Sequence, residues 1–86
     1  MNQEELQKLT EKISRDYFYR PFLHMVKINH RMTTTGGRYH LYDDHHIEIN
    51  AHFLEEKNQK YLVGIIKHEL CHYHLHLMGL GYQHKD

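Results

Sequence analysis

The sequence predicts a small α+β domain, and three observations lead to that fold class. Apolar residues recur at helical spacing near both ends of the 86-residue chain. Between them lie three short segments in which apolar and polar residues alternate, as they do in half-buried strands. The chain is 40% hydrophobic and 26% charged, which is the composition of a globular protein. We therefore expect one domain over residues 1–86, with an N-terminal helix, a small three-stranded sheet and a C-terminal helix that packs on the sheet.

The first helix is expected over about residues 3–18. Asn2 followed by Glu5 resembles a capping box, with Asn in place of the usual Ser or Thr. Pro21 ends the helix, because proline lacks an N–H donor and restricts the residue before it. The apolar residues that continue the helical spacing are Leu6, Leu9, Ile13 and Tyr17.

Three strands are expected, at residues 23–29, 38–42 and 45–50. A turn at residues 33–37 separates the first two, with its glycines supplying positive φ angles. Asp43-Asp44 forms a tight turn between the second and third strands, which therefore pair as a hairpin.

A long helix is expected over about residues 59–78, with Asn58 as its N-cap and with Gly79 and Gly81 after its end. Before it, Asn50 caps a short helical turn through Leu54. The apolar stripe of the long helix consists of Leu62, Val63, Ile66, Leu70, Tyr73 and Leu77.

A chain of this size gains little stability from its core alone, so we expect an additional stabilising link, or staple, such as a disulfide or a bound metal ion. The single cysteine, Cys71, cannot close an internal disulfide and is expected to be a small buried residue. Eleven histidines point instead to a metal ion.

The long helix carries the motif His68-Glu69-Leu70-Cys71-His72. Two histidines four residues apart on a helix lie about 6 Å apart along its axis, so both imidazoles can reach one ion. Glu69 is rotated away from this pair and is placed to hydrogen-bond a water on the metal. Two His ligands with Glu69 as general base are the arrangement of zinc hydrolases.

The third ligand must come from outside this helical turn. His76 lies about 12 Å from His68 along the axis, which one ion cannot span. We favour His84, because it is the first histidine after the chain can turn back at the glycines that follow the helix. Asp86 is the second choice. Lesser candidates are His40, His45, His46 and His52.

In these motifs the sequence resembles the SprT-like family of zinc metallopeptidases. The resemblance implies a minimal zincin-like fold, in which His68, His72 and His84 bind zinc and Glu69 is the catalytic base. Family members usually continue past the third histidine, so this chain is expected to lack a C-terminal extension. The segments that carry the resemblance are Gly36-Gly37-Arg38-Tyr39, Ile47-Glu48-Ile49-Asn50, His68-Glu69-Leu70-Cys71-His72 and Gly81-Tyr82-Gln83-His84-Lys85-Asp86.

The leading hypothesis is a zinc metallopeptidase of the HExxH type that hydrolyses peptide bonds in a protein or peptide substrate. The alternative is a zinc-stapled, non-enzymatic module that binds DNA or protein. A structural zinc site has four protein ligands, whereas a catalytic site has three and a water, so the coordination number separates the two.

The family's eukaryotic members are DNA-dependent proteases, which raises DNA as a further partner. One stretch between Tyr17 and Tyr42 lacks carboxylates and combines basic with aromatic residues, which suits single-stranded nucleic acid. The competing interpretation is that its aromatic residues belong to the core. The lone cysteine, the absence of a signal-like N-terminus and the lack of a long apolar run predict a cytoplasmic protein without a membrane partner.

Overall fold

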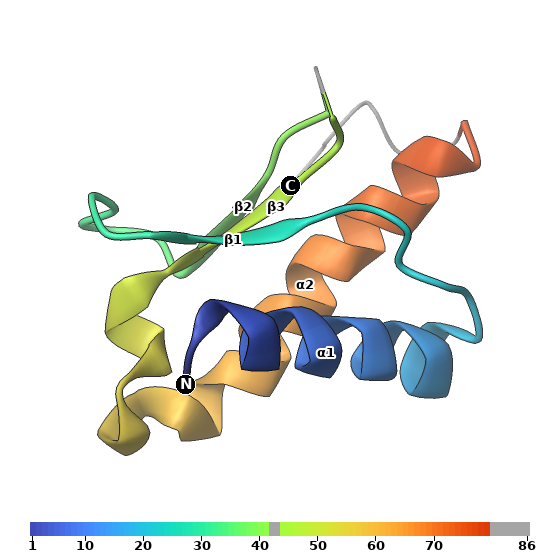
Figure 1. The fold of residues 1–86 in the computed structure, drawn as a ribbon. Helices are drawn as coiled ribbons and strands as arrows, with labels where there is room; N and C mark the ends of the chain where they lie inside the picture. Colours follow the sequence, from blue (N-terminus) through green and yellow to red (C-terminus); the bar gives the residue numbers. More distant parts are fainter. Residues whose placement is uncertain (42–43, 80–86) are drawn as a thin grey trace.

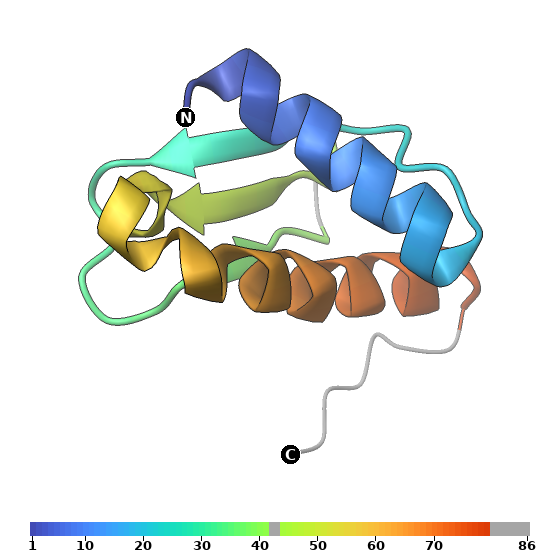
Figure 2. The ribbon, with the colours of Figure 1, turned by 90° about the horizontal axis from the view of Figure 1, so that it is seen from below.

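The structure, a computed structural model, describes residues 1–41 and 44–79 and confirms the α+β fold class. Its elements are α1 (Gln3–Ile13), β1 (Val26–Asn29), β2 (Gly37–Tyr39), β3 (Ile47–Asn50) and α2 (Gln59–Leu77), with short helical turns between some of them. Both α-helices lie on the same side of the sheet, as Figures 1 and 2 show. In the described residues, no helix is both long enough and apolar enough to cross a membrane.

The predicted N-terminal helix is present and ends in a different helical form. Asn2 forms the expected capping box, because its side chain accepts from the Glu5 N–H while the Glu5 carboxylate accepts from the Asn2 N–H. After α1 the chain continues as a π-helical turn at Ser14–Phe18. Tyr19, in the left-handed region with φ 57°, ends this turn two residues before Pro21.

A buried hydrogen-bond chain joins the π-helical turn to α2. The Ser14 hydroxyl donates to the Arg20 carbonyl (2.6 Å), and its oxygen lies 2.7 Å from His74 Nε2. Because the one hydroxyl proton is already used, His74 donates its Nε2–H to Ser14. Burial, together with the charge of Arg20, lowers the pKa of His74, which keeps this imidazole neutral.

The sheet has the order β1-β3-β2, so β3 lies at its centre. β1 runs parallel to β3, and β2 pairs antiparallel with β3, which confirms the predicted hairpin. The first strand is shorter than predicted, because the Leu23 N–H bonds to the Tyr73 hydroxyl instead of joining the sheet. The second ends at Tyr39 and the third starts at Ile47, and part of the predicted turn between them lies outside the described residues.

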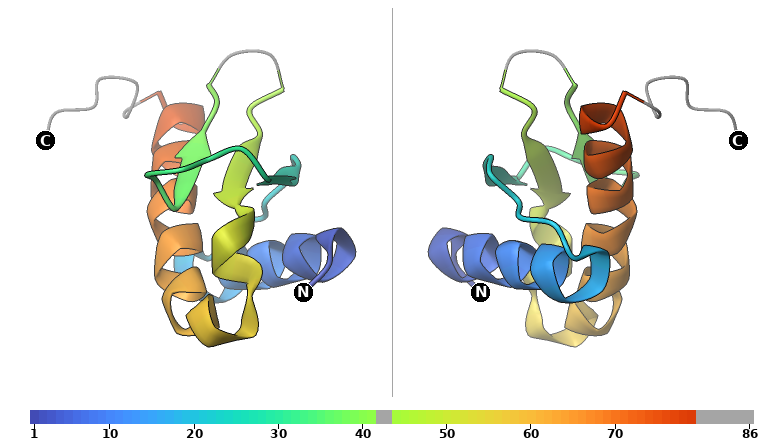
Figure 3. Two further views of the ribbon diagram at one scale, coloured as in Figure 1. Left: turned by 90° about the vertical axis from the view of Figure 1, so that its left-hand side faces the viewer. Right: turned by 90° about the vertical axis from the view of Figure 1, so that its right-hand side faces the viewer.

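Helices α1 and α2 lie to one side of the sheet (Figure 3), and the side chains on its two faces differ in character. Strand residues that face the helices are apolar, and Val26, Ile47 and Ile49 are fully buried. The opposite face carries polar side chains from all three strands. These residues are Lys27, Asn29, Arg38, Glu48 and, beside the strand ends, His40 and His46.

Helix α2 supplies a large part of the core, although its apolar stripe is narrower than predicted. Val63 is 41% exposed because it lies about 60° around the helix from the buried Ile66, and Leu77 is 47% exposed because it is the last residue of the helix. Cys71 is exposed and not buried as expected, since it lies about 180° around the helix from Leu62. The buried apolar residues of α2 are Leu62, Ile66, Leu70 and Tyr73.

The caps around α2 agree with the prediction only in part. Asn50 caps the short turn Ala51–Leu54 by accepting from the His52 N–H. Asn58 stands at the N-cap of α2 without a side-chain cap bond, because its amide group donates to the His52 carbonyl. Gly79 follows the helix with φ 75°, as expected, whereas Gly81 lies outside the described residues.

The glycines of the predicted 33–37 turn are required for close packing and not for positive φ. A Cβ atom on Gly36 would lie 2.7 Å from Ile65 Cδ1. A Cβ atom on Gly37 would lie 3.1 Å from Glu69 Cγ and 3.2 Å from the Glu48 carbonyl oxygen. The start of β2 therefore lies directly against α2.

We predict opposite effects from alanine at Gly37 and at Gly64. Gly37→Ala should lower the free energy of unfolding by about 1–3 kcal/mol, because the new methyl group overpacks the contact between β2 and α2. Gly64 lies within α2 with open space around it. Gly64→Ala should therefore raise stability by about 0.5–1 kcal/mol through helix propensity. Urea unfolding measures both values, and equal stabilities for the two variants would contradict this account of the close approach.

Candidate metal centre and adjoining groove

His68 and His72 lie one turn apart on α2, and their side chains converge. The two Nε2 atoms are 3.2 Å apart. Tetrahedral zinc with Zn–N distances near 2.05 Å requires its two nitrogen ligands to lie about 3.3 Å apart. The observed separation therefore fits two ligands of one zinc ion. His68 is exposed and His72 is partly exposed, so an ion can reach both from solvent.

Glu69 occupies a different environment from the two histidines. Its side chain is 6% exposed and lies beside Gly37 of β2. Glu69 and His68 border an open groove of about 520 Å³ between the start of β2 and α2. Thr35, Gly36 and Gly37 form one side of this groove, and residues of α2 from Tyr61 onward form the other. The carboxylate is thus held by the fold at the edge of a space that a ligand can enter.

His84 and Asp86, the two preferred candidates for a third ligand, lie outside the described residues. Within residues 1–41 and 44–79, no further His, Cys, Asp or Glu completes a three-ligand group with His68 and His72. His76 turns toward the sheet, where its Nδ1 lies 3.1 Å from the Tyr39 hydroxyl.

The lesser histidine candidates all lie in other groups of contacts. His45 Nδ1 lies 3.1 Å from the Tyr39 hydroxyl, and His52 lies 2.9 Å from the Glu55 carboxylate. His40 and His46 gather with Glu48, and these three side chains form a cluster that could hold a metal. Sequence reasoning named the two histidines but missed Glu48. The signal was available, because residues 46 and 48 of one strand must share a face.

The carboxylate-free stretch divides between surface and core. Tyr17 and Tyr19 are 57% and 87% exposed, whereas Phe22 is buried and Phe18 and Tyr39 pack against the core. Lys67 Nζ lies 3.8 Å from the centre of the Tyr17 ring, so this tyrosine already has a cationic partner. Nucleic-acid binding by this stretch stays a prediction. Only its exposed tyrosines and basic residues are available to contact a nucleic acid.

Comparison with known proteins agrees with the family resemblance that the motifs indicate. The sequence model of the SprT-like family matches residues 6–86. The chain belongs to the SprT-like family. It is 58% identical over all 86 residues to the "Protein SprT-like" of Bacillus subtilis (strain 168) and 54% identical to that of Bacillus cereus (strain G9842). It spans 57% and 56% of the lengths of these two curated relatives. No solved structure gives a significant match.

We predict that His68→Ala removes one zinc equivalent from this SprT-like chain. The substitution deletes one of two converging imidazoles, and His30→Ala is the matched control because His30 is exposed and lies outside both histidine groups. Zinc content after dialysis, measured by mass spectrometry of the metal, distinguishes the variants. An unchanged zinc content in His68→Ala would contradict the assignment.

Proposed function

We propose that this chain forms the catalytic core of a zinc-dependent metallopeptidase with a minimal zincin-like fold, as a single domain. One observation carries the proposal. The Nε2 atoms of His68 and His72 lie 3.2 Å apart, and the buried Glu69 lies beside them on a groove. The spacing fits the HExxH pattern, in which two histidines bind zinc and the glutamate is the general base.

The donor set suits zinc in particular. Imidazole nitrogen is a preferred zinc ligand, and both His68 and His72 can bind zinc through Nε2. His84 is the third ligand in this proposal, which leaves a fourth position for water. Bound zinc supplies Lewis acidity, which makes water nucleophilic at neutral pH and polarises a peptide carbonyl.

Glu69 would move the proton in the reaction. Its carboxylate accepts a proton from the attacking water and later delivers that proton to the leaving amine nitrogen. The contact between Gly37 and the Glu69 side chain limits the positions that this carboxylate can take. A fixed base lowers the cost of orienting the reacting groups during the proton transfer.

The substrate in this proposal is an extended polypeptide. β2 lies at an edge of the sheet, and the groove runs between the start of this strand and α2. An extended peptide can pair with an exposed strand edge through main-chain hydrogen bonds. β3 cannot serve in this way, because it is the central strand and is paired on both sides. The lack of a side chain at Gly64, which also lines the groove, leaves room for a substrate residue.

We predict that Glu69→Gln abolishes peptide hydrolysis and retains zinc. The amide cannot accept the proton, so the rate should fall by about 100-fold or more. Glu56→Gln is the control, because Glu56 is an exposed carboxylate on a short helical turn before α2. Cleavage of an unfolded protein substrate, followed on gels beside a zinc assay, gives the result.

Two outcomes would contradict the proposal. Equal hydrolysis by Glu69→Gln and Glu56→Gln would remove Glu69 from the mechanism. No hydrolysis by the zinc-loaded parent protein would favour the alternative, a zinc-stapled binding module without catalysis.

A further inference from the structure

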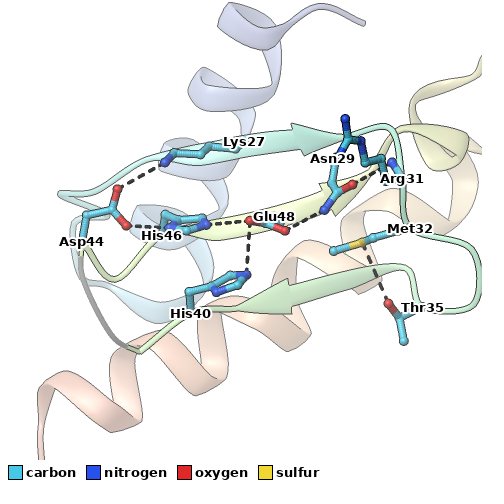
Figure 4. A network of polar contacts seen from close by, with 9 residues as sticks. All are labelled: Lys27, Asn29, Arg31, Met32, Thr35, His40, Asp44, His46 and Glu48. Atoms are coloured by element: carbon cyan, nitrogen blue, oxygen red, sulfur yellow. Dashed lines mark hydrogen bonds and ion pairs between the residues drawn. The ribbon is translucent and has the colours of Figure 1, made fainter.

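The outward face of the sheet carries a second group of potential ligands, separate from the HExxH motif on α2. In Figure 4 these side chains lie on the near side of the sheet, and the helices lie behind it. The β2–β3 register pairs Tyr39 with Ile47, and the His40 N–H bonds to the His46 carbonyl. His40 and His46 are therefore cross-strand neighbours. Glu48 lies two residues beyond His46 and so projects from the same face.

Three donor atoms of this cluster converge. One ligand atom from each of His40, His46 and Glu48 lies within 4.8 Å of the others. Glu48 Oε2 lies 2.8 Å from His46 Nε2 and 3.2 Å from His40 Nε2. His40 Nε2 is buried and makes no hydrogen bond within the described part of the chain, despite this short distance. A buried polar atom without a hydrogen bond is uncommon in proteins, and a bound cation would give this nitrogen a partner besides Glu48.

His46 lies between two carboxylates. Its Nδ1 is 2.5 Å from Asp44 Oδ1, and its Nε2 is 2.8 Å from Glu48 Oε2. A neutral imidazole has one N–H, so it can donate to only one of these oxygens. The other contact brings two acceptors together, which requires either a second proton on the ring or a cation. Asp44 is the more exposed of the two acids, with its side chain 50% exposed against 18% for Glu48.

The orientation of these groups matches a known feature of metal sites. Histidine ligands usually donate the other ring N–H to a carboxylate, which fixes the tautomer and directs the free nitrogen at the metal. Asp44 is placed to accept from Nδ1, which leaves Nε2 of His46 directed at Glu48. Asn29 donates to Glu48 Oε1 (2.8 Å) and thereby leaves Oε2 facing the two histidines.

We propose that His40, His46 and Glu48 form a second binding site for a zinc-like divalent cation, with Asp44 positioning His46. Two imidazole nitrogens and one carboxylate oxygen are a ligand set that zinc, cobalt and nickel accept. Two cationic side chains lie nearby and weaken an incoming cation's attraction to the site. Lys27 is 3.3 Å from Asp44, and Arg38 pairs with Glu48 in the strand register. Lys27 also pairs with Glu48 in the β1–β3 register, but its ammonium group has Asp44, the outer acid, as its partner.

The test uses full-length protein in which His68→Ala and His72→Ala disable the helix site. Calorimetric titration with Zn²⁺, and visible absorption with Co²⁺ alone, report any remaining site. We expect one ion per chain in this background. Adding His46→Gln should weaken Co²⁺ binding by about tenfold or more and remove the ligand-field absorption, and adding Asp44→Asn should weaken binding by about tenfold. His30→Gln is the matched control and should leave binding unchanged.

Two results would overturn the proposal. One is a double variant that binds neither Zn²⁺ nor Co²⁺. The other is a His46→Gln protein that binds Co²⁺ as tightly as the His30→Gln control. Circular dichroism establishes that each variant is folded, and the exposed Asp44→Asn change keeps the test valid if His46→Gln unfolds. Since the helix site is removed in every protein compared, these results are independent of peptidase activity.

Discussion

The close contact between strand β2 and helix α2 is the constraint on which the rest of the structure depends. It requires residues without a Cβ at Gly36 and Gly37, since a methyl group at either position would press on Ile65 or Glu69. The contact sets the depth at which Glu69 is buried and the width of the groove beside it. The same helix then presents His68 and His72 toward solvent. One packing interaction thereby separates a buried glutamate from two accessible histidines.

The sheet divides the histidines of this small domain into groups with different surroundings. On the helix side, His74 is buried against Ser14 and remains neutral, so it is part of the core. His68 and His72 lie on the outer surface of α2. On the opposite face of the sheet, Glu48 gathers His40 and His46. Burial alone raises the pKa of Glu48, but hydrogen bonds from His46 and Asn29 and the nearby histidine charges lower it to about 2. This carboxylate is therefore ionised at neutral pH.

Local patterns predicted most of the fold, because the fold is built from local signals. The capping box at Asn2, the hairpin of β2 and β3 and the extent of α2 were all readable from spacing. The exposure of Cys71 was readable as well, because this residue lies about 180° around α2 from Leu62 of the predicted stripe, whereas the exposure of Val63 depends on which elements cover α2. The role of Gly37 was also mistaken, because a close approach between distant segments leaves no local signature. In the candidate site, the motif predicted His68, Glu69 and His72, whereas the position of His40 beside His46 and Glu48 depends on the strand register.

The most direct test of the central claim is a crystal structure of the full-length protein grown with zinc, with anomalous diffraction measured at the zinc absorption edge. The account predicts an anomalous peak within bonding distance of the Nε2 atoms of His68 and His72, with His84 as the third protein ligand and Glu69 near the ion but not bound to it. Absence of a peak between these two imidazoles, with both rings turned apart in solvent, would contradict it.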